Sequence, residues 1–221
     1  MREKVVEFIY KRDQIPVSKQ KIHVDDIFLS NGASQGIHEV LVGLLEPGRD
    51  AVMIPIPQYP LYAAELALQN AHVVKYYLEE DKNWSLNIEE IERAYDAAPV
   101  KPKIMVIINP GNPTGQVLSR ENLQQIIKFC YEKRIAIMCD EVYQKNIYTD
   151  QEFLSAYKVA IEMGDPYDSG VEIFSFHSTS KGLLGECGQR GGYAHFHNLD
   201  RKVWEQLFKI RSIGLCPNTM G

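Results

Sequence analysis

A lysine follows a run of hydroxyl side chains in the last quarter of the sequence. The run 175–180 (SFHSTS) precedes Lys181, and a glycine-rich segment that ends at Arg190 follows it. A lone lysine after a strand is usually a solvated loop residue, and the glycines are compatible with simple turns. An amine in such surroundings can also bond to a carbonyl compound. These residue types favour an aldehyde cofactor that carries a phosphate, provided that other segments complete the site.

The segment Gly32-Ala33-Ser34 has the composition of an anion-binding turn. It lies between a predicted strand and a predicted helix. Small residues leave backbone N–H groups accessible, the helix dipole favours an anion at this end, and Ser34 adds a hydroxyl. A simple helix N-cap accounts for the same residues, so the segment alone does not separate the two interpretations.

Two prolines enclose Asn112 in the segment 110–115 (PGNPTG) after a predicted buried strand. The alternative interpretation is a rigid turn. The prolines restrict the direction of the Asn112 amide more than a turn requires, which favours a site. The Asn112–Pro113 bond is also a candidate for a cis peptide bond.

Asp140 stands at the end of another predicted buried strand, where an unpaired carboxylate is costly. It can cap a helix, or it can keep a pyridinium nitrogen protonated. Tyr143 follows three residues later and can offer its phenol to the same ligand. Tyr59 lies between Pro57 and Pro60 beyond a further strand. Most aromatic residues belong to the core, but a ring fixed at this place can stack on a planar cofactor.

Predicted strands and helices alternate along the chain and bring these residues together. Apolar runs predict strands at 27–29, 51–56, 71–78, 103–109, 135–139, 171–176 and 192–197. Helical spacing predicts helices near 1–12, 37–46, 60–70, 87–98, 119–133, 152–163 and 200–213, with Asn87 and Ser119 as N-caps. The alternation predicts one α/β domain, a three-layer αβα arrangement with a mostly parallel sheet of about seven strands. Ligands of such sheets bind outside the carboxyl ends of the strands, where the candidate residues stand.

The composition argues against several classes of protein. A net charge of −5 without a basic stripe disfavours nucleic acid or an anionic membrane as a partner. No apolar run approaches the roughly 20 residues of a membrane span, and the charged start MREK disfavours a secretory signal. The scattered histidines predict no metal site. The four separate cysteines, predicted to be reduced thiols of an intracellular protein, are Cys130, Cys139, Cys187 and Cys216.

Five segments together resemble one known family. In chain order they are NGASQG, IPIPQYPLY, NPGNPTG, DEVYQ and SFHSTSKGLLGECGQRGGY. They resemble the fold-type-I aminotransferases that depend on pyridoxal 5'-phosphate (PLP), and the resemblance extends from about residue 25 to the C-terminus. Within that family, the second and fifth segments most resemble the alanine aminotransferases.

The resemblance implies a role for each matching residue. Lys181 would bond to the cofactor aldehyde and move the proton between the substrate α-carbon and the cofactor. Asp140 would pair with the pyridine nitrogen, and Tyr59 would stack on the ring. Asn112 and Tyr143 would hydrogen-bond the phenolic oxygen, and Asn112 would also contact the substrate. The residues implied to hold the phosphate are Ala33 through its N–H, Ser34, Ser178 and Arg190.

The implied reaction transfers an amino group between L-alanine and 2-oxoglutarate and gives pyruvate and L-glutamate. The partners would be small-molecule amino acid and 2-oxo acid substrates. Two alternatives stay open. The same constellation serves aminotransferases of other amino-acid specificity and some lyases. The chain could also be a non-catalytic, truncated product that binds PLP or a full-length partner.

Family members extend beyond both ends of this chain. They have a small domain that carries an arginine for the substrate carboxylate, and an N-terminal arm that helps to form a dimer. We therefore expect an N-terminal helix and lead-in at 1–24, a PLP-binding large domain at 25–215, and the start of a truncated C-terminal region at 216–221. We also expect a homodimer in the full-length form, a cytoplasmic rather than mitochondrial location, and impaired turnover in this chain.

Overall fold

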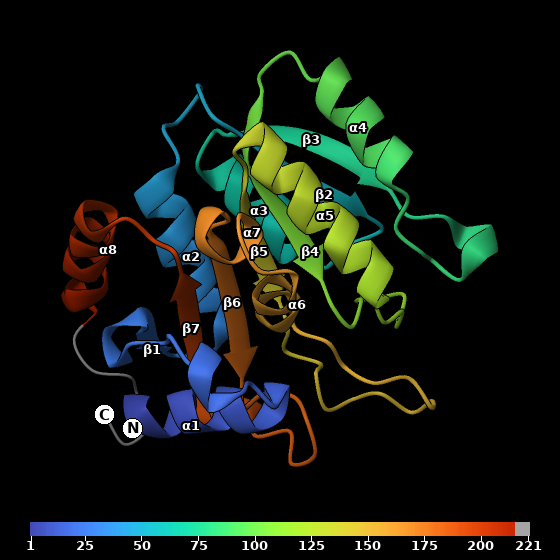
Figure 1. The fold of residues 1–221 in the computed structure, drawn as a ribbon. Helices are drawn as coiled ribbons and strands as arrows, with labels where there is room; N and C mark the ends of the chain where they lie inside the picture. The colour runs from blue at the N-terminus through green and yellow to red at the C-terminus, as the bar shows by residue number, and fades with distance from the viewer. Residues whose placement is uncertain (215–221) are drawn as a thin grey trace.

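A single sheet forms the centre of the computed structural model, which describes residues 1–214 (Figure 1). Its strands are β1 (Ile27–Ser30), β2 (Ala51–Ile56), β3 (His72–Tyr77), β4 (Pro102–Ile108), β5 (Ala136–Asp140), β6 (Ile173–Ser178) and β7 (Gly192–His197). They lie in the order β1-β7-β6-β5-β4-β2-β3. β7 is antiparallel to both of its neighbours, and all other adjacent strands are parallel. The seven strands and their mostly parallel arrangement confirm the predicted sheet.

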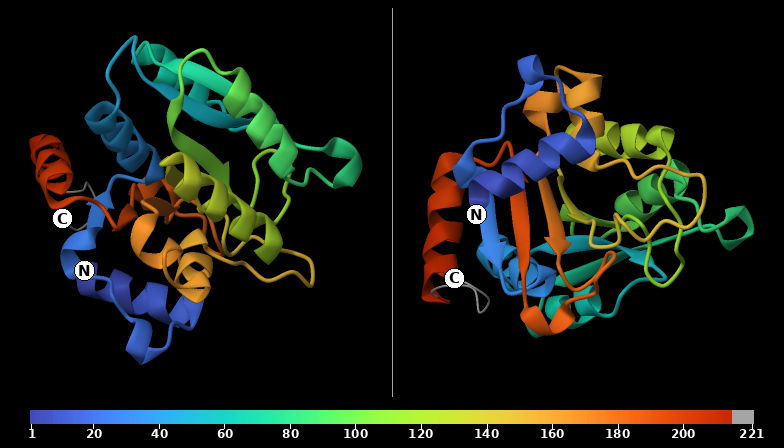
Figure 2. Two further views of the ribbon diagram at one scale, coloured as in Figure 1. Left: turned by 45° about the horizontal axis from the view of Figure 1, so that its top comes forward. Right: turned by 90° about the horizontal axis from the view of Figure 1, so that it is seen from below.

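Helices cover both faces of the sheet (Figures 1 and 2). They are α1 (Arg2–Asp13), α2 (Ala33–Leu44), α3 (Leu61–Leu68), α4 (Ile88–Ala97), α5 (Arg120–Lys133), α6 (Ala156–Met163), α7 (Tyr167–Gly170) and α8 (Arg201–Ile213). One apolar cluster joins α4, α5 and α6 to the sheet, and a second joins α2, α3 and α8 to its other face. This three-layer αβα arrangement is the predicted fold class.

Alternation along the central strands decides which face each residue meets. In β5, Ile137 packs in the first cluster, whereas Ala136 and Met138 pack in the second. Asp140 has the same parity as Met138, because successive side chains of a strand point to opposite faces. The strand therefore directs the Asp140 carboxylate toward α2 and α3.

α1 lies across the end of the sheet at which β6 finishes (Figures 1 and 2). The ring of Phe8 stacks on His177, with centroids 6.0 Å apart, and meets the edge of Tyr193. Ile9 is 1% exposed and packs in a third apolar cluster with Ile27. The helix is thus attached to both β6 and β1.

The predicted helix caps are present, and several element boundaries differ from the prediction, two of them with a clear physical reason. Asn87 accepts a hydrogen bond from Glu89 N–H, and Ser119 accepts one from Asn122 N–H. α6 begins at Ala156 rather than near 152, because Ser155 caps it and the Leu154 carbonyl accepts a hydrogen bond from the distant Asn109 side chain. β6 runs two residues beyond the predicted end, since its pairing with β7 continues to Ser178.

Within residues 1–214, no helix combines the length and the apolar character needed to cross a membrane. Cys130, Cys139 and Cys187 are free thiols, as expected for reduced cysteines. Cys216 and the predicted boundary region 216–221 lie outside the described residues.

Gly192 begins β7 at a point where three backbone segments meet. A Cβ at this position would lie 2.7 Å from the His177 carbonyl oxygen and 2.9 Å from the carbonyl carbon of Gly32. We predict that Gly192→Ala lowers the free energy of unfolding by about 1–3 kcal/mol, because the added methyl group overpacks rigid backbone. Urea unfolding followed by circular dichroism measures this change.

Gly188→Ala is the matched control from the preceding loop. Apart from its own chain neighbours, no heavy atom lies within 4 Å of the Cβ that this substitution adds. Its effect should therefore stay within about 0.5 kcal/mol. Equal stability of the two variants would contradict the prediction.

Candidate active site

A cavity of about 240 Å³ lies at the carboxyl ends of β5 and β6, beside the N-termini of α2 and α3. All residues for which the sequence predicts a cofactor contact line it, namely Ala33, Ser34, Tyr59, Asn112, Asp140, Tyr143, Ser178, Lys181 and Arg190. Its other lining residues are Ile37, Leu61, Val142, Ser180 and Cys187. The structure thus brings the predicted residues together, and their individual roles stay predictions.

Asp140 lines the cavity and is 5% exposed. Oδ2 accepts a hydrogen bond from Tyr62 OH at 2.9 Å, and Oδ1 accepts one from Val142 N–H at 3.3 Å. Burial raises the pKa of Asp140, while these two hydrogen bonds and the charge of Lys181 oppose the rise. Among the described residues, no cationic side chain forms an ion pair with Asp140. A ligand with a positive group would therefore be favoured here.

The wall of the cavity brings together an amine, a phenol and an amide. Lys181 Nζ lies 5.3 Å from the centroid of the Tyr143 ring, within the range of cation–π attraction. Asn112 Nδ2 donates to Tyr143 OH at 3.4 Å. The Asn112–Pro113 peptide bond is cis, as predicted.

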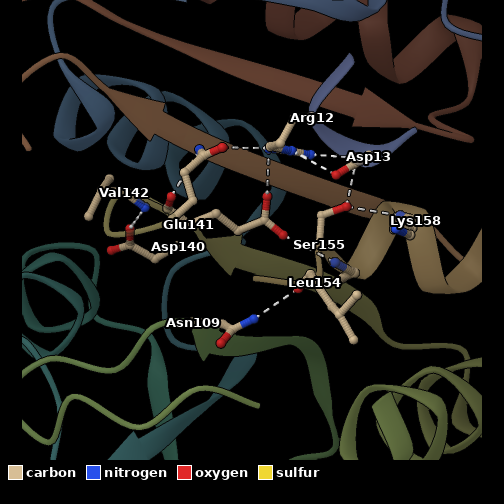
Figure 3. Close-up of polar contacts among 11 residues, drawn as sticks. Arg12, Asp13, Asn109, Asp140, Glu141, Val142, Leu154, Ser155 and Lys158 are labelled. Carbon is tan, nitrogen blue, oxygen red and sulfur yellow. Dashed lines mark hydrogen bonds and ion pairs between the residues drawn. The ribbon is translucent and has the colours of Figure 1, made fainter. Parts of the chain in front are cut away.

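Asn109 anchors the loop that carries Asn112. It is 1% exposed, and its N–H donates to the Asp140 carbonyl at 2.9 Å. Its side-chain Nδ2 donates to Leu154 O at 3.0 Å (Figure 3), and Oδ1 accepts from Leu118 N–H at 2.9 Å. Asn109 therefore ties the two ends of the loop to each other and attaches the loop to the strand that supplies Asp140.

Arg190 crosses the N-terminus of α2. Its Nη2 donates to Asn31 O at 2.9 Å, and its Nη1 donates to Cys187 O at 3.0 Å and to Ser180 Oγ at 3.3 Å. Gly32 has a φ of +80°, and a Cβ there would lie 2.5 Å from Arg190 Nη2. The positive φ favours glycine at this position, and the close approach puts the guanidinium charge beside the positive end of the helix dipole. The combination is suited to bind an anion.

Serine hydroxyls border this anion-binding end. Ser178 Oγ donates to Gly191 O at 3.2 Å and accepts from Ser180 N–H at 3.0 Å. Ser34 lies in the first turn of α2. Ser180 was not among the predicted site residues, although its place in the hydroxyl run beside Lys181 is a signal that could have identified it.

Comparison with known proteins decides the family. The model of the family described as "Aminotransferase class I and II" matches residues 1–220. The chain belongs to this aminotransferase family. It is 48% identical over its full length to alanine aminotransferase 1 of Bos taurus. It is also 44% identical over 99% of its length to glutamate–glyoxylate aminotransferase 1 of Arabidopsis thaliana. It spans 45% of the length of each of these two relatives.

Solved structures of aminotransferases have the same fold. The aminotransferase chain superimposes on an aminotransferase from Escherichia coli with a TM-score of 0.85 and 28% sequence identity. It superimposes on an alanine aminotransferase from Pyrococcus furiosus with a TM-score of 0.85 and 25% identity. In both comparisons 99% of this chain is covered, together with 50% and 51% of the other chains.

Sequence reasoning missed two groups of residues that support the site in this aminotransferase chain. Tyr62, which donates to Asp140 from 78 positions away, lies in an apolar helix and has the pattern of an ordinary core residue. A buried polar cluster behind the site was also missed (Figure 3). Its members are Arg12, Asp13, Glu141, Gln144 and Ser155. In both groups, only the contacts between residues distant in the sequence indicate that these side chains support the site.

Tyr62→Phe removes the phenol that donates to Asp140 and keeps the ring. We predict a loss of about 1.5–3 kcal/mol in the free energy of unfolding near pH 8, because the hydrogen bond is made to an ionised group. The hydrogen bond lowers the pKa of Asp140, so its loss raises that pKa further. The difference from wild type should therefore shrink as the pH falls and Asp140 becomes protonated. Urea unfolding at a series of pH values measures it.

Tyr76→Phe is the control, since Tyr76 is equally buried but donates to the neutral carbonyl of Val106 at 2.7 Å. It should cost about 0.5–1.5 kcal/mol without this pH dependence. The same pH dependence in both variants would refute our account of the Asp140 contact.

Proposed function

We propose that this chain forms the PLP-binding part of an aminotransferase. The observation that carries the proposal is the arrangement of charge in one cavity. A buried Asp140 carboxylate, the Lys181 amine, and Arg190 beside the N-terminus of α2 line the same space. PLP has a matching group for each, namely a basic ring nitrogen, a phosphate and an aldehyde. The donor set therefore fits this cofactor.

The residues of the chain would share the work as follows. When bound, PLP supplies a ring that accepts the electron pair released at an amino-acid α-carbon. Asp140 is suited to hold a proton on the ring nitrogen, because its buried carboxylate is stabilised by a positive neighbour. Lys181 would carry the covalent link and, once released, move the proton at the substrate α-carbon. Asn112 and Tyr143 would contact the phenolic oxygen, and Asn112 would also contact the substrate.

The remaining residues would hold the ring and the phosphate. Tyr59 is 45% exposed and can cover one face of a planar ring. Arg190 can bind two phosphate oxygens through its fork of donors. The further phosphate contacts in this proposal are the N–H of Ala33 and the hydroxyls of Ser34 and Ser178.

The substrates that we propose are L-alanine and 2-oxoglutarate, with pyruvate and L-glutamate as products. The 48% identity with a protein named alanine aminotransferase 1 supports this pair. A second candidate is transfer from glutamate to glyoxylate, which the 44% identity with a glutamate–glyoxylate aminotransferase supports. The two identities are too similar to separate these reactions.

We further propose that residues 25–215 form the PLP-binding large domain of a homodimeric protein of the cytoplasm. The family resemblance supports the domain and the dimer. The compartment differs among relatives, because a Dictyostelium discoideum protein that is 46% identical is named a probable mitochondrial alanine aminotransferase. Sedimentation of the protein and fractionation of cells that express it test the two proposals separately.

Incubation with PLP, borohydride reduction and peptide mapping test the cofactor site. We predict a pyridoxyl adduct on Lys181, because this lysine lines the cavity together with Asp140 and Arg190. Lys181→Ala should lose this adduct. Lys145→Ala is the control, since Lys145 is exposed, does not line the cavity, and lies beside Gly182 in the same region. An adduct spread over surface lysines with none on Lys181 would overturn the proposed cofactor site.

The two candidate reactions are separated by product analysis of the full-length protein. We predict that pyruvate formed from L-alanine and 2-oxoglutarate exceeds glycine formed from L-glutamate and glyoxylate at equal substrate concentrations. Lys181→Ala serves as the blank, because it lacks the amine that both reactions need. An excess of glycine would favour the second candidate.

A further inference from the structure

A turn of four residues, Glu141 to Gln144, follows β5 and forms part of the cavity wall. Its middle residues, Val142 and Tyr143, line the cavity. The N–H of Val142 donates to Asp140 Oδ1. The position of this turn therefore sets one of the two hydrogen bonds that direct the Asp140 carboxylate.

Arg12 contacts both ends of the turn from the opposite side. Its Nη1 donates to Gln144 Oε1 at 3.1 Å and lies 3.6 Å from Glu141 Oε2. Gln144 Nε2 donates to the Glu141 carbonyl at 3.1 Å, which closes the turn. In Figure 3, the Glu141 side chain is directed toward Arg12, whereas the Asp140 carboxyl group is directed away from it. The same turn thus faces Arg12 at its ends and the cavity at its centre.

The position of Arg12 is itself fixed. Its side chain is 7% exposed, and Nε and Nη2 donate to the two carboxylate oxygens of Asp13 at 2.8 and 2.6 Å. Asp13 Oδ2 accepts from Ser155 Oγ at 2.8 Å, and this hydroxyl also caps α6 by accepting from Lys158 N–H. A guanidinium held through several donors at once keeps a defined direction, which a single ammonium would not.

The buried charges of this cluster indicate that it does more than fill space. Burial raises the pKa of Glu141 to about 7, and Arg12 and the N–H of Ala156 act against that rise. Asp13 and Asp140 add to it. Taking charged groups out of water is unfavourable by itself, and apolar side chains would cover the end of the sheet without that penalty.

We propose that Arg12 is a positioning residue for the candidate active site, which holds the 141–144 turn so that the Val142 N–H directs the Asp140 carboxylate into the cavity. The proposal rests on the proposed function, because Asp140 affects cofactor affinity only if the cavity binds PLP. α1 then supports the site from behind, although none of its residues lines the cavity.

A double-mutant cycle on the affinity for PLP tests this role. We expect Arg12→Gln to raise the dissociation constant about tenfold in the wild-type background, and to change it less than twofold in an Asp140→Asn background, because contacts that act through one another are not additive. In an Arg190→Gln background the tenfold effect should persist, since Arg190 acts at the phosphate end. An equal effect of Arg12→Gln in all three backgrounds would show that Arg12 only stabilises the fold.

Two further variants keep this test decisive. Gln144→Met removes the acceptor for Arg12, and with it the Gln144 donor to the Glu141 carbonyl, without a change of charge. It leaves the Arg12–Asp13 pair in place, so it tests the same hold on the turn if Arg12→Gln does not fold. Arg2→Gln is the matched control on the same helix, because the half-buried Arg2 pairs with Asp25 at 2.9 Å, away from the turn. Arg2→Gln should leave the dissociation constant unchanged, and a loss of affinity equal to that of Arg12→Gln would overturn the proposal.

A readout without cofactor separates this proposal from the proposed function. Carboxyl-carbon NMR of the ligand-free protein reports the titration of Asp140. Arg12→Gln and Gln144→Met should both raise the pKa of Asp140, because the Val142 hydrogen bond that lowers it is weakened, and Arg2→Gln should not. If wild type binds no PLP, the proposed function fails, but the titration still decides whether Arg12 positions Asp140. An unchanged Asp140 titration in both variants would refute the positioning role.

Discussion

The carboxylate of Asp140 is an acidic group that is almost completely buried, and much of the surrounding structure serves to hold it. β5 brings it to the end of the sheet, and Tyr62 and the Val142 N–H each give it a neutral hydrogen bond. These contacts reduce the penalty of burial, but they do not neutralise the charge. A site that keeps a buried carboxylate is suited to bind a cationic atom of a ligand. The need of Asp140 for a positive partner thus connects the fold to the proposed chemistry.

The residues around this carboxylate have two functions, contact with a ligand and support of the site, and they lie on different sides of the strand ends. On the side of α2 and α3, the cavity presents Asp140, Lys181 and Arg190 to a ligand. Behind the strand ends, Arg12 and its carboxylate partners fix the turn that follows β5. Rigid elements with supporting contacts hold reactive groups more accurately than free loops do. The first helix of the chain therefore belongs to the architecture of the site, even though it lies outside the cavity.

Residues with local signals could be predicted from the sequence, and residues whose roles depend on distant partners could not. Asp140 and Asn112 follow apolar runs, and prolines mark the loop of Asn112, so the parallel topology is enough to bring them together. Tyr62 resembles a core residue, and its role follows only from a carboxylate 78 positions away. The start of α6 was placed too early, because the carbonyl of Leu154 is taken by the remote Asn109 side chain. Arg12 and Asp13 at the end of a helix have the pattern of surface charges, since nothing local indicates that another element covers them.

Because the chain reverses direction between β6 and β7, the loop that contains Lys181 and Arg190 can tolerate changes in its length and sequence. Both ends of this loop lie at the same edge of the sheet, where Thr179 N–H donates to Gly191 O at 3.0 Å. Gly182 N–H is held by Asn146 Oδ1 near the lysine, whereas Leu183 and Leu184 at the tip are 96% and 76% exposed. Closing a loop whose ends are already held costs only about 0.6 kcal/mol more when its length doubles. The tip can therefore lengthen or change its sequence at little cost in stability while the amine and the guanidinium stay in place.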